Sequence, residues 1–120
     1  MIIALWIVNA ILALLFLAFG VMKLVRPKDA LAASGMAWTE DASAGAVKAV
    51  GAVEALGALG LILPLATGIV PVLTPLAAIG LALTMAGAII VHIRREESFA
   101  APAVLLIIAA GSAVLGFLNL

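Results

Sequence analysis

Residues 2–22 decide the fold, because they form an unbroken apolar stretch that reads IIALWIVNAILALLFLAFGVM. This stretch holds no charged side chain, and Asn9 is its only strongly polar residue. A helix of about 20 apolar residues crosses the ~30 Å hydrocarbon core of a bilayer. Basic residues follow the stretch instead of preceding it, and no A-x-A site closes it. It therefore predicts a membrane span and not a signal peptide.

Three further stretches have similar length and apolarity. Together with the first, they predict four membrane helices over residues 2–23, 44–65, 75–93 and 99–119. The one long connection, residues 24–43, carries Trp38, which we expect to anchor a short surface helix at the headgroup level. The sequence thus predicts an all-α protein, a single transmembrane four-helix bundle over residues 1–120.

Composition excludes several classes of protein. Of the 120 residues, 68% are hydrophobic and 10% are charged, and six basic residues balance six acidic ones. A soluble domain of this size cannot bury so much apolar surface, and zero net charge speaks against a nucleic-acid partner. With no cysteine and one histidine, we expect no thiol chemistry, no metal site and no bound cofactor.

Four residues predict where helices begin and end. Thr39 is the expected N-cap of the second span, and Thr74 is the expected N-cap of the third, with Pro75 at its first helical position. Pro64 lacks a backbone N–H and is expected to kink or end the second span.

The charged residues all map to one side of the predicted membrane. Lys, Arg, Asp and Glu occur near the two loops that follow the first and third spans, whereas the opposite side has none. Because Lys and Arg favour the cytoplasmic side, these two loops are expected in the cytoplasm. Both termini lie on the opposite side of the membrane and are therefore expected outside.

Small residues recur at three- and four-residue spacing in two of the spans. The short connection between these two spans predicts that they are antiparallel neighbours, and small residues at this spacing allow helices to approach closely. We expect this packing from Gly51, Ala55, Ala58, Gly80, Thr84 and Ala88. The fourth span has fewer small residues, so it is expected to face lipid or another subunit.

Glu54 is the charged side chain that lies deepest in the predicted membrane. A carboxylate at this depth is costly, so it should face the bundle and have a partner. Lys23 and His92, at the ends of the first and third spans, are the two candidates, and Asn9 lies deeper. The cluster is either a structural ion pair that sets helix register or the lining of a cavity that handles a proton or a polar ligand head.

Several segments together resemble the DoxX-like family of small bacterial membrane proteins. They are Phe19-Gly20-x-x-Lys23-Leu24, Met36-Ala37-Trp38-x-Glu40-Asp41, Gly51-x-x-Glu54 continuing to Pro64, Leu73-Thr74-Pro75 continuing to Leu81, and His92 before a basic pair. The resemblance implies a four-span bundle in the bacterial inner membrane, with lysine, glutamate and histidine at positions 23, 54 and 92. It also implies relatives that partner redox enzymes, since the family is named after a small subunit of a thiosulfate:quinone oxidoreductase. More distantly, the resemblance extends to membrane proteins that bind sterols or assist receptor assembly.

Three functions follow as hypotheses. The first is a non-enzymatic membrane module that forms a homo-oligomer or binds a partner, since no convincing catalytic constellation is present. The second is a subunit of a redox complex whose bundle binds a quinone near Lys23 or His92. The third is binding or transport of a small hydrophobic molecule or lipid. A proton-shuffling isomerase that uses Glu54 and His92 is a further reading, favoured least.

Overall fold

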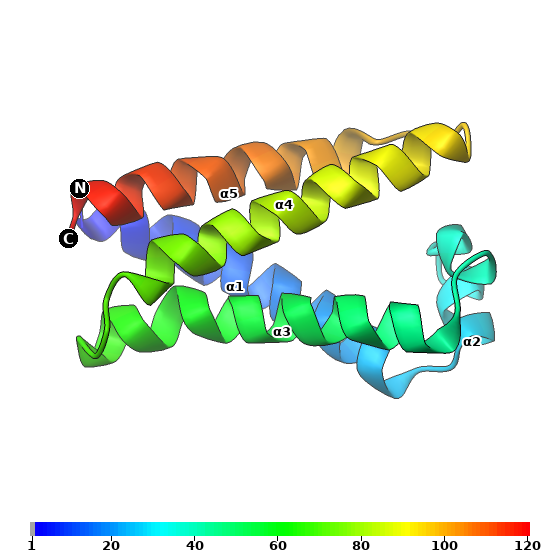
Figure 1. The fold of residues 1–120 in the computed structure, drawn as a ribbon, viewed down its shortest axis with the longest axis horizontal. Coiled ribbons are helices and arrows are strands. Elements are labelled where there is room, and N and C mark those ends of the chain that lie inside the picture. Colours follow the sequence, from blue (N-terminus) through cyan, green and yellow to red (C-terminus); the bar gives the residue numbers. More distant parts are fainter. Residues whose placement is uncertain (1) are drawn as a thin grey trace.

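Four long helices make up most of the protein (Figure 1). The structure is a computed structural model that describes residues 2–120. The long helices are α1 (Ile2–Val25), α3 (Ala44–Thr67), α4 (Leu73–Arg94) and α5 (Ala100–Leu118). The short helix α2 (Lys28–Ala33) and the 3-10 turn η1 (Ala37–Glu40) connect α1 to α3. Each long helix is apolar and long enough to cross a membrane, so the prediction of an all-helical, four-span bundle is confirmed.

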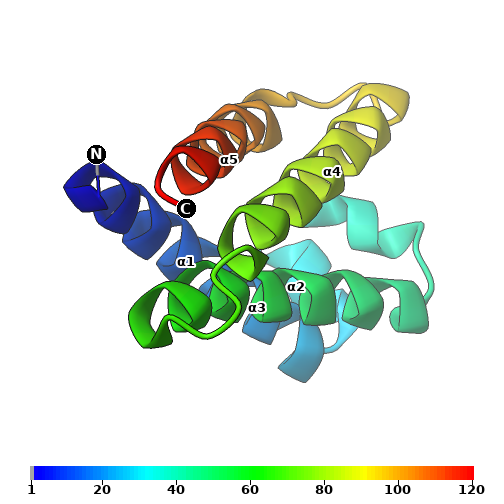
Figure 2. The same ribbon diagram turned by 60° about the vertical axis from the view of Figure 1, so that its left-hand side comes forward.

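The helices pack as two pairs. α1 packs mainly on α3 and α4 mainly on α5, and the contact of α3 with α4 joins the pairs (Figures 1 and 2). α5 also contacts α1, so one face of the fourth span packs on two helices of the same chain, and its exposed face keeps the expectation of lipid or another subunit as a prediction. Its small residues Ala109, Ala113 and Gly116 are buried, and a Cβ at Gly116 would lie 2.9 Å from Pro75. These few small residues are enough to let α5 pack closely on its neighbouring helices.

The backbones of α1 and α3 come closest at two glycines. A Cβ at Gly20 would lie 2.7 Å from the Gly51 carbonyl oxygen and 2.8 Å from the Ala55 amide nitrogen. A Cβ at Gly51 would lie 2.7 Å from the Gly20 carbonyl oxygen. No side chain fits between backbones at this separation, so glycine is required at both positions.

The small residues of α3 and α4 differ in what they do. Gly51, Ala55 and Ala58 lie at helix contacts or in the core. The prediction that Gly80 lies at a helix contact is wrong, because a Cβ at this position would meet nothing within 4 Å. Thr84 and Ala88 line a cavity, and the Thr84 hydroxyl donates to the Gly80 carbonyl one turn earlier. α4 instead approaches α3 where Gly57 meets Leu81 and Gly60 meets Ala77.

The predicted start of α3, start of α4 and end of α3 also differ from the structure. α3 begins after Ser43, whose hydroxyl accepts from the Ala46 amide, whereas Thr39 lies in η1 and donates to the Met36 carbonyl. α4 begins at Leu73, so Thr74 and Pro75 are its second and third residues instead of its N-cap and first residue. The buried Thr74 hydroxyl has no partner among the described residues. α3 continues through Pro64 to Thr67. A helix packed in a bundle tolerates a proline where other groups satisfy the freed carbonyls.

Asn9 of α1 bonds to the carbonyl next to the one that Pro64 frees, which is that of Gly60. The Asn9 side-chain nitrogen donates to the Leu61 carbonyl at 3.0 Å, in the turn that the ring of Pro64 crowds. Its side-chain oxygen accepts from the Ser112 hydroxyl of α5. Asn9 thus joins α1, α3 and α5 through two hydrogen bonds, and its side chain is fully buried.

Replacing Asn9 by Leu is expected to destabilise the bundle by about 1–3 kcal/mol, because two buried polar partners lose their hydrogen bonds. The measurement is the melting temperature of the purified protein in mild detergent. Ser112→Ala, which removes one of the two bonds, should cause a smaller loss. A melting temperature of the Asn9→Leu variant equal to that of the wild type would show that Asn9 does not hold the three helices.

Candidate functional site

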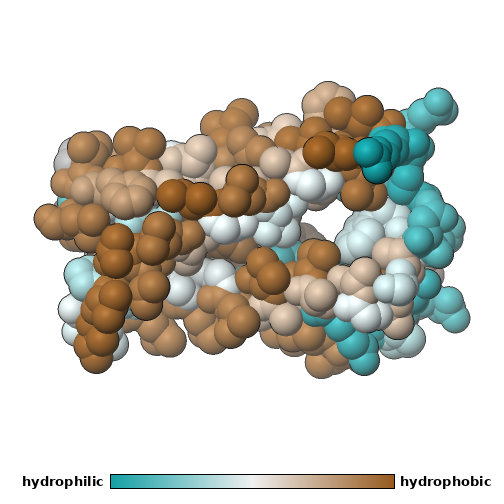
Figure 3. All heavy atoms as spheres, in the orientation of Figure 1, coloured by the Kyte–Doolittle hydropathy of each residue, from teal (hydrophilic) through white to brown (hydrophobic). Residues whose placement is uncertain are grey.

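A cavity of about 480 Å³ lies between the four long helices near one end of the bundle. We call this end the charged end, because it contains α2, η1 and the α4–α5 connection, and hydrophilic residues gather there (Figure 3). Figure 3 also shows a hollow close to this end, between α3 and α4. Most of the cavity wall is apolar; its polar members include Lys23, Glu54, Thr84 and His92.

Lys23 and Glu54 form a buried ion pair at the wall of the cavity, with exposed fractions of 7% and 2%. The direction of the two helices explains why they meet. Helical side chains tilt toward the N-terminus of their own helix. In the antiparallel pair of α1 and α3, Lys23 therefore reaches deeper into the bundle while Glu54 reaches toward the charged end. The close approach of Gly20 and Gly51 brings the two backbones near enough for the lysine ammonium to contact the carboxylate.

Two aromatic rings flank the lysine. The Nζ atom of Lys23 lies 5.9 Å from the centre of the Trp38 ring and 6.0 Å from that of Phe19. Both distances suit a cation–π interaction. Trp38 thus lines the cavity, where we had expected a headgroup anchor. Its position depends on how η1 packs on α2 beyond the end of α1, and residue spacing carries no signal for such a loop.

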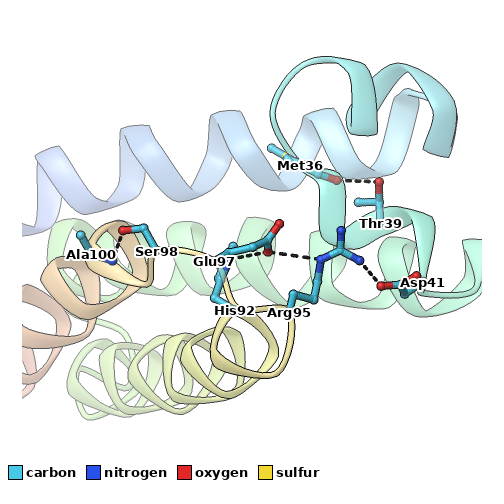
Figure 4. Close-up of polar contacts among 8 residues, drawn as sticks. All are labelled: Met36, Thr39, Asp41, His92, Arg95, Glu97, Ser98 and Ala100. Carbon is cyan, nitrogen blue, oxygen red and sulfur yellow. Dashed lines mark hydrogen bonds and ion pairs between the residues drawn. The ribbon is translucent and has the colours of Figure 1, made fainter.

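His92 lines the same cavity but bonds elsewhere (Figure 4). Its Nδ1 atom lies 3.1 Å from Glu97 Oε1, and Arg95 Nε lies 3.2 Å from the same oxygen. Arg95 also pairs with Asp41, so this network links the α4–α5 connection to the residue that follows η1. Glu96 adopts a left-handed conformation with a φ of 56°, which turns the chain so that the Glu97 amide donates to the His92 carbonyl.

The structure therefore brings together only part of the predicted cluster. Lys23 and Glu54 are in contact, His92 shares their cavity through a separate network, and Asn9 lies apart in the helix core. Sequence reasoning missed Ser112 as the partner of Asn9. The signal available for it was weak, since a serine in a membrane helix often bonds only to its own backbone.

These features define a four-span helical membrane protein with a polar group inside an otherwise apolar cavity. The sequence pattern described as the DoxX-like family matches residues 7–112, and the chain belongs to this family. Neither the curated proteins nor the solved structures contain a match to the chain.

Proposed function

We propose that the protein is a non-enzymatic membrane module that binds a small apolar molecule with a polar head inside its bundle. The observation that carries this proposal is the cavity of about 480 Å³ bordered by the Lys23–Glu54 pair. Ligand sites have volumes of about 300–1,000 Å³, mostly apolar walls and a few polar groups that orient the ligand. The cavity has these properties.

The position of the ion pair favours binding over a purely structural role. A pair that served only to set helix register needs no open space beside it. Here the pair borders the cavity together with Phe19, Trp38 and Met85. The same side chains that stabilise the contact of α1 with α3 therefore also present polar atoms to a ligand.

The other polar groups at the wall can also contact a ligand. The Thr84 hydroxyl donates to a backbone carbonyl and the His92 ring bonds to Glu97. Thr84 Oγ1 can still accept a hydrogen bond, and His92 bonds to Glu97 through Nδ1, which leaves Nε2 for a ligand.

The environment forms part of the proposal. The charged end faces the cytoplasm of a bacterial inner membrane, with both termini outside, because all six Lys and Arg lie in or near the connections at this end. The cavity then lies in the inner leaflet, where a lipid-soluble molecule reaches it from the bilayer.

Native mass spectrometry of gently extracted protein tests the proposal. We expect a bound small molecule on the wild type. The fraction of protein that retains the molecule should be at least about tenfold lower in the Ala88→Phe variant, since Ala88 lines the cavity and a phenyl group would fill the cavity. Ala110→Phe, at an exposed position of α5 outside the cavity wall, is the matched control and should retain the molecule. Wild-type protein that carries no bound molecule and takes none up on titration would refute the proposal.

The same spectra separate the alternatives. A quinone-linked redox subunit is the second candidate, supported by the Lys23 ammonium at the cavity wall, which would donate to a quinone carbonyl. A retained mass equal to that of the host quinone favours it, and absence of quinone after titration opposes it. An oligomeric module is supported by Gly87 and Gly111, exposed helix glycines with open space beside them. A strictly monomeric mass, with no cross-linked partner in bilayers, opposes the oligomer.

A further inference from the structure

We infer that the ligand is a neutral, largely apolar alcohol, whose hydroxyl oxygen accepts from Lys23 and whose hydroxyl hydrogen is donated to Glu54. This inference rests on the proposed function and names the class of molecule that the cavity takes. It follows from the hydrogen-bonding capacity of the ion pair, from the charge at the cavity wall and from the side on which the cavity opens.

The ion pair has hydrogen-bonding capacity that the protein leaves unused. A lysine ammonium has three donor hydrogens, and a carboxylate has two acceptor oxygens. Lys23 Nζ bonds to Glu54 Oε1, and no other hydrogen bond to either side chain occurs among residues 2–120. Buried polar atoms almost always have partners, so the remaining donors and acceptor are expected to meet a polar group in the cavity.

The pair offers a donor and an acceptor side by side. A hydroxyl group is the smallest group that matches both, because it accepts and donates through a single oxygen. A ketone, an ether or a quinone carbonyl only accepts, and would leave the carboxylate oxygen without a partner. The cost of an unmatched polar atom in a dry site gives the pair its selectivity.

The charge at the wall favours a neutral molecule. Lys23 and Glu54 cancel each other, and the remaining titratable group of the wall, His92, is bonded to Glu97. A carboxylate or an ammonium ligand would add a net charge to a site inside the membrane, which is costly. Fatty acids and amines are therefore disfavoured.

The cavity opens toward the bilayer. Gly87 and Val91 of α4 are exposed and line the cavity, and the hollow lies on the face between α3 and α4 (Figure 3). At the charged end, Trp38 borders the cavity and Arg95 joins Asp41 beyond it (Figure 4). A molecule with an apolar body thus enters from lipid, and its head meets the ion pair.

A set of matched probes tests this inference on the full-length protein in lipid nanodiscs. The probes are 1-dodecanol, dodecyl methyl ether, 2-dodecanone and dodecanoate, each titrated as a mole fraction of the bilayer. Trp6→Phe leaves Trp38 as the only tryptophan, because the chain has two, so its emission reports on the cavity. Native mass spectrometry counts the bound probe independently. We expect dodecanol to half-saturate at a mole fraction about tenfold lower than any of the other three.

Two variants assign the selectivity to the pair. In Lys23→Met/Glu54→Leu, dodecanol and its ether should bind equally, whereas Lys48→Met, which removes an exposed lysine outside the cavity wall, should keep the tenfold difference. Equal binding of alcohol, ether and ketone to the unmodified pair would overturn the inference and leave the proposed function standing. Tightest binding of dodecanoate would do the same. If no probe binds and no molecule is retained after extraction, the proposed function itself fails.

Discussion

Replacing Lys23 by Met is expected to destabilise the protein by about 3–5 kcal/mol, the largest effect of any single substitution at the site. The reason is that Glu54 would keep its charge or take up a proton in a position that is 2% exposed, with no other partner among the described residues. The measurement is the melting temperature in mild detergent, together with the fraction of protein that elutes as a folded species. We expect a large loss in both.

The double variant Lys23→Met/Glu54→Leu is the decisive control for that prediction. It removes both charges and fills the space with apolar atoms, so it should recover most of the stability, as buried ion pairs often do when both members are replaced. Lys48→Met changes an exposed lysine near the start of α3 and should have little effect. If Lys23→Met were as stable as Lys48→Met, the buried pair would contribute nothing to folding.

Gly20→Ala is the second substitution with a large expected effect. Its new methyl group would lie 2.7 Å and 2.8 Å from backbone atoms of α3, which cannot move without separating the helices. We expect a loss of about 1–3 kcal/mol. The displacement would also widen the gap between Lys23 and Glu54, so probe selectivity at the cavity should fall along with the melting temperature.

Gly80→Ala is the matched control, since it makes the same change in a helix where the added methyl group meets nothing within 4 Å. It should be neutral or slightly stabilising, because alanine favours helix more than glycine does. Equal melting temperatures for the two variants would show that the close contact of α1 with α3 is not required. The comparison separates helix propensity from helix packing, which a single variant cannot do.

The predicted spans agree with the observed helices to within two residues at each end. Such agreement is expected because a membrane helix satisfies its backbone hydrogen bonds internally, so apolar length alone specifies it. The exact ends were harder to predict. Ser43 caps α3 whereas Thr39 lies in η1 and donates to the Met36 carbonyl, so the start of α3 depends on how η1 folds. Pro64 does not end α3. Asn9 of α1 bonds to the Leu61 carbonyl in the turn that precedes this proline.

Of the residues at the candidate site, Glu54 was the one that the sequence identified, because its charge is the most costly to place inside the membrane. A carboxylate inside a membrane helix requires a partner, so Glu54 was identifiable from depth alone. The choice between Lys23 and His92 was not, since both lie at helix ends of suitable height. The glycine contact of α1 with α3 decided for Lys23, and the turn at Glu96 gave His92 a different partner.

The sequence by itself determined the solvent of this protein, its four spans, the separation of its charges to one end and the depth of Glu54. These follow from the transfer of each residue between water and lipid, which depends on composition along the chain and not on neighbours in space. Only the tertiary structure decided that α5 packs on α4, that Trp38 turns inward and that the ion pair borders a cavity. Packing contacts join residues far apart in the chain, and close approach depends on the match of two surfaces, so no single stretch of sequence specifies them.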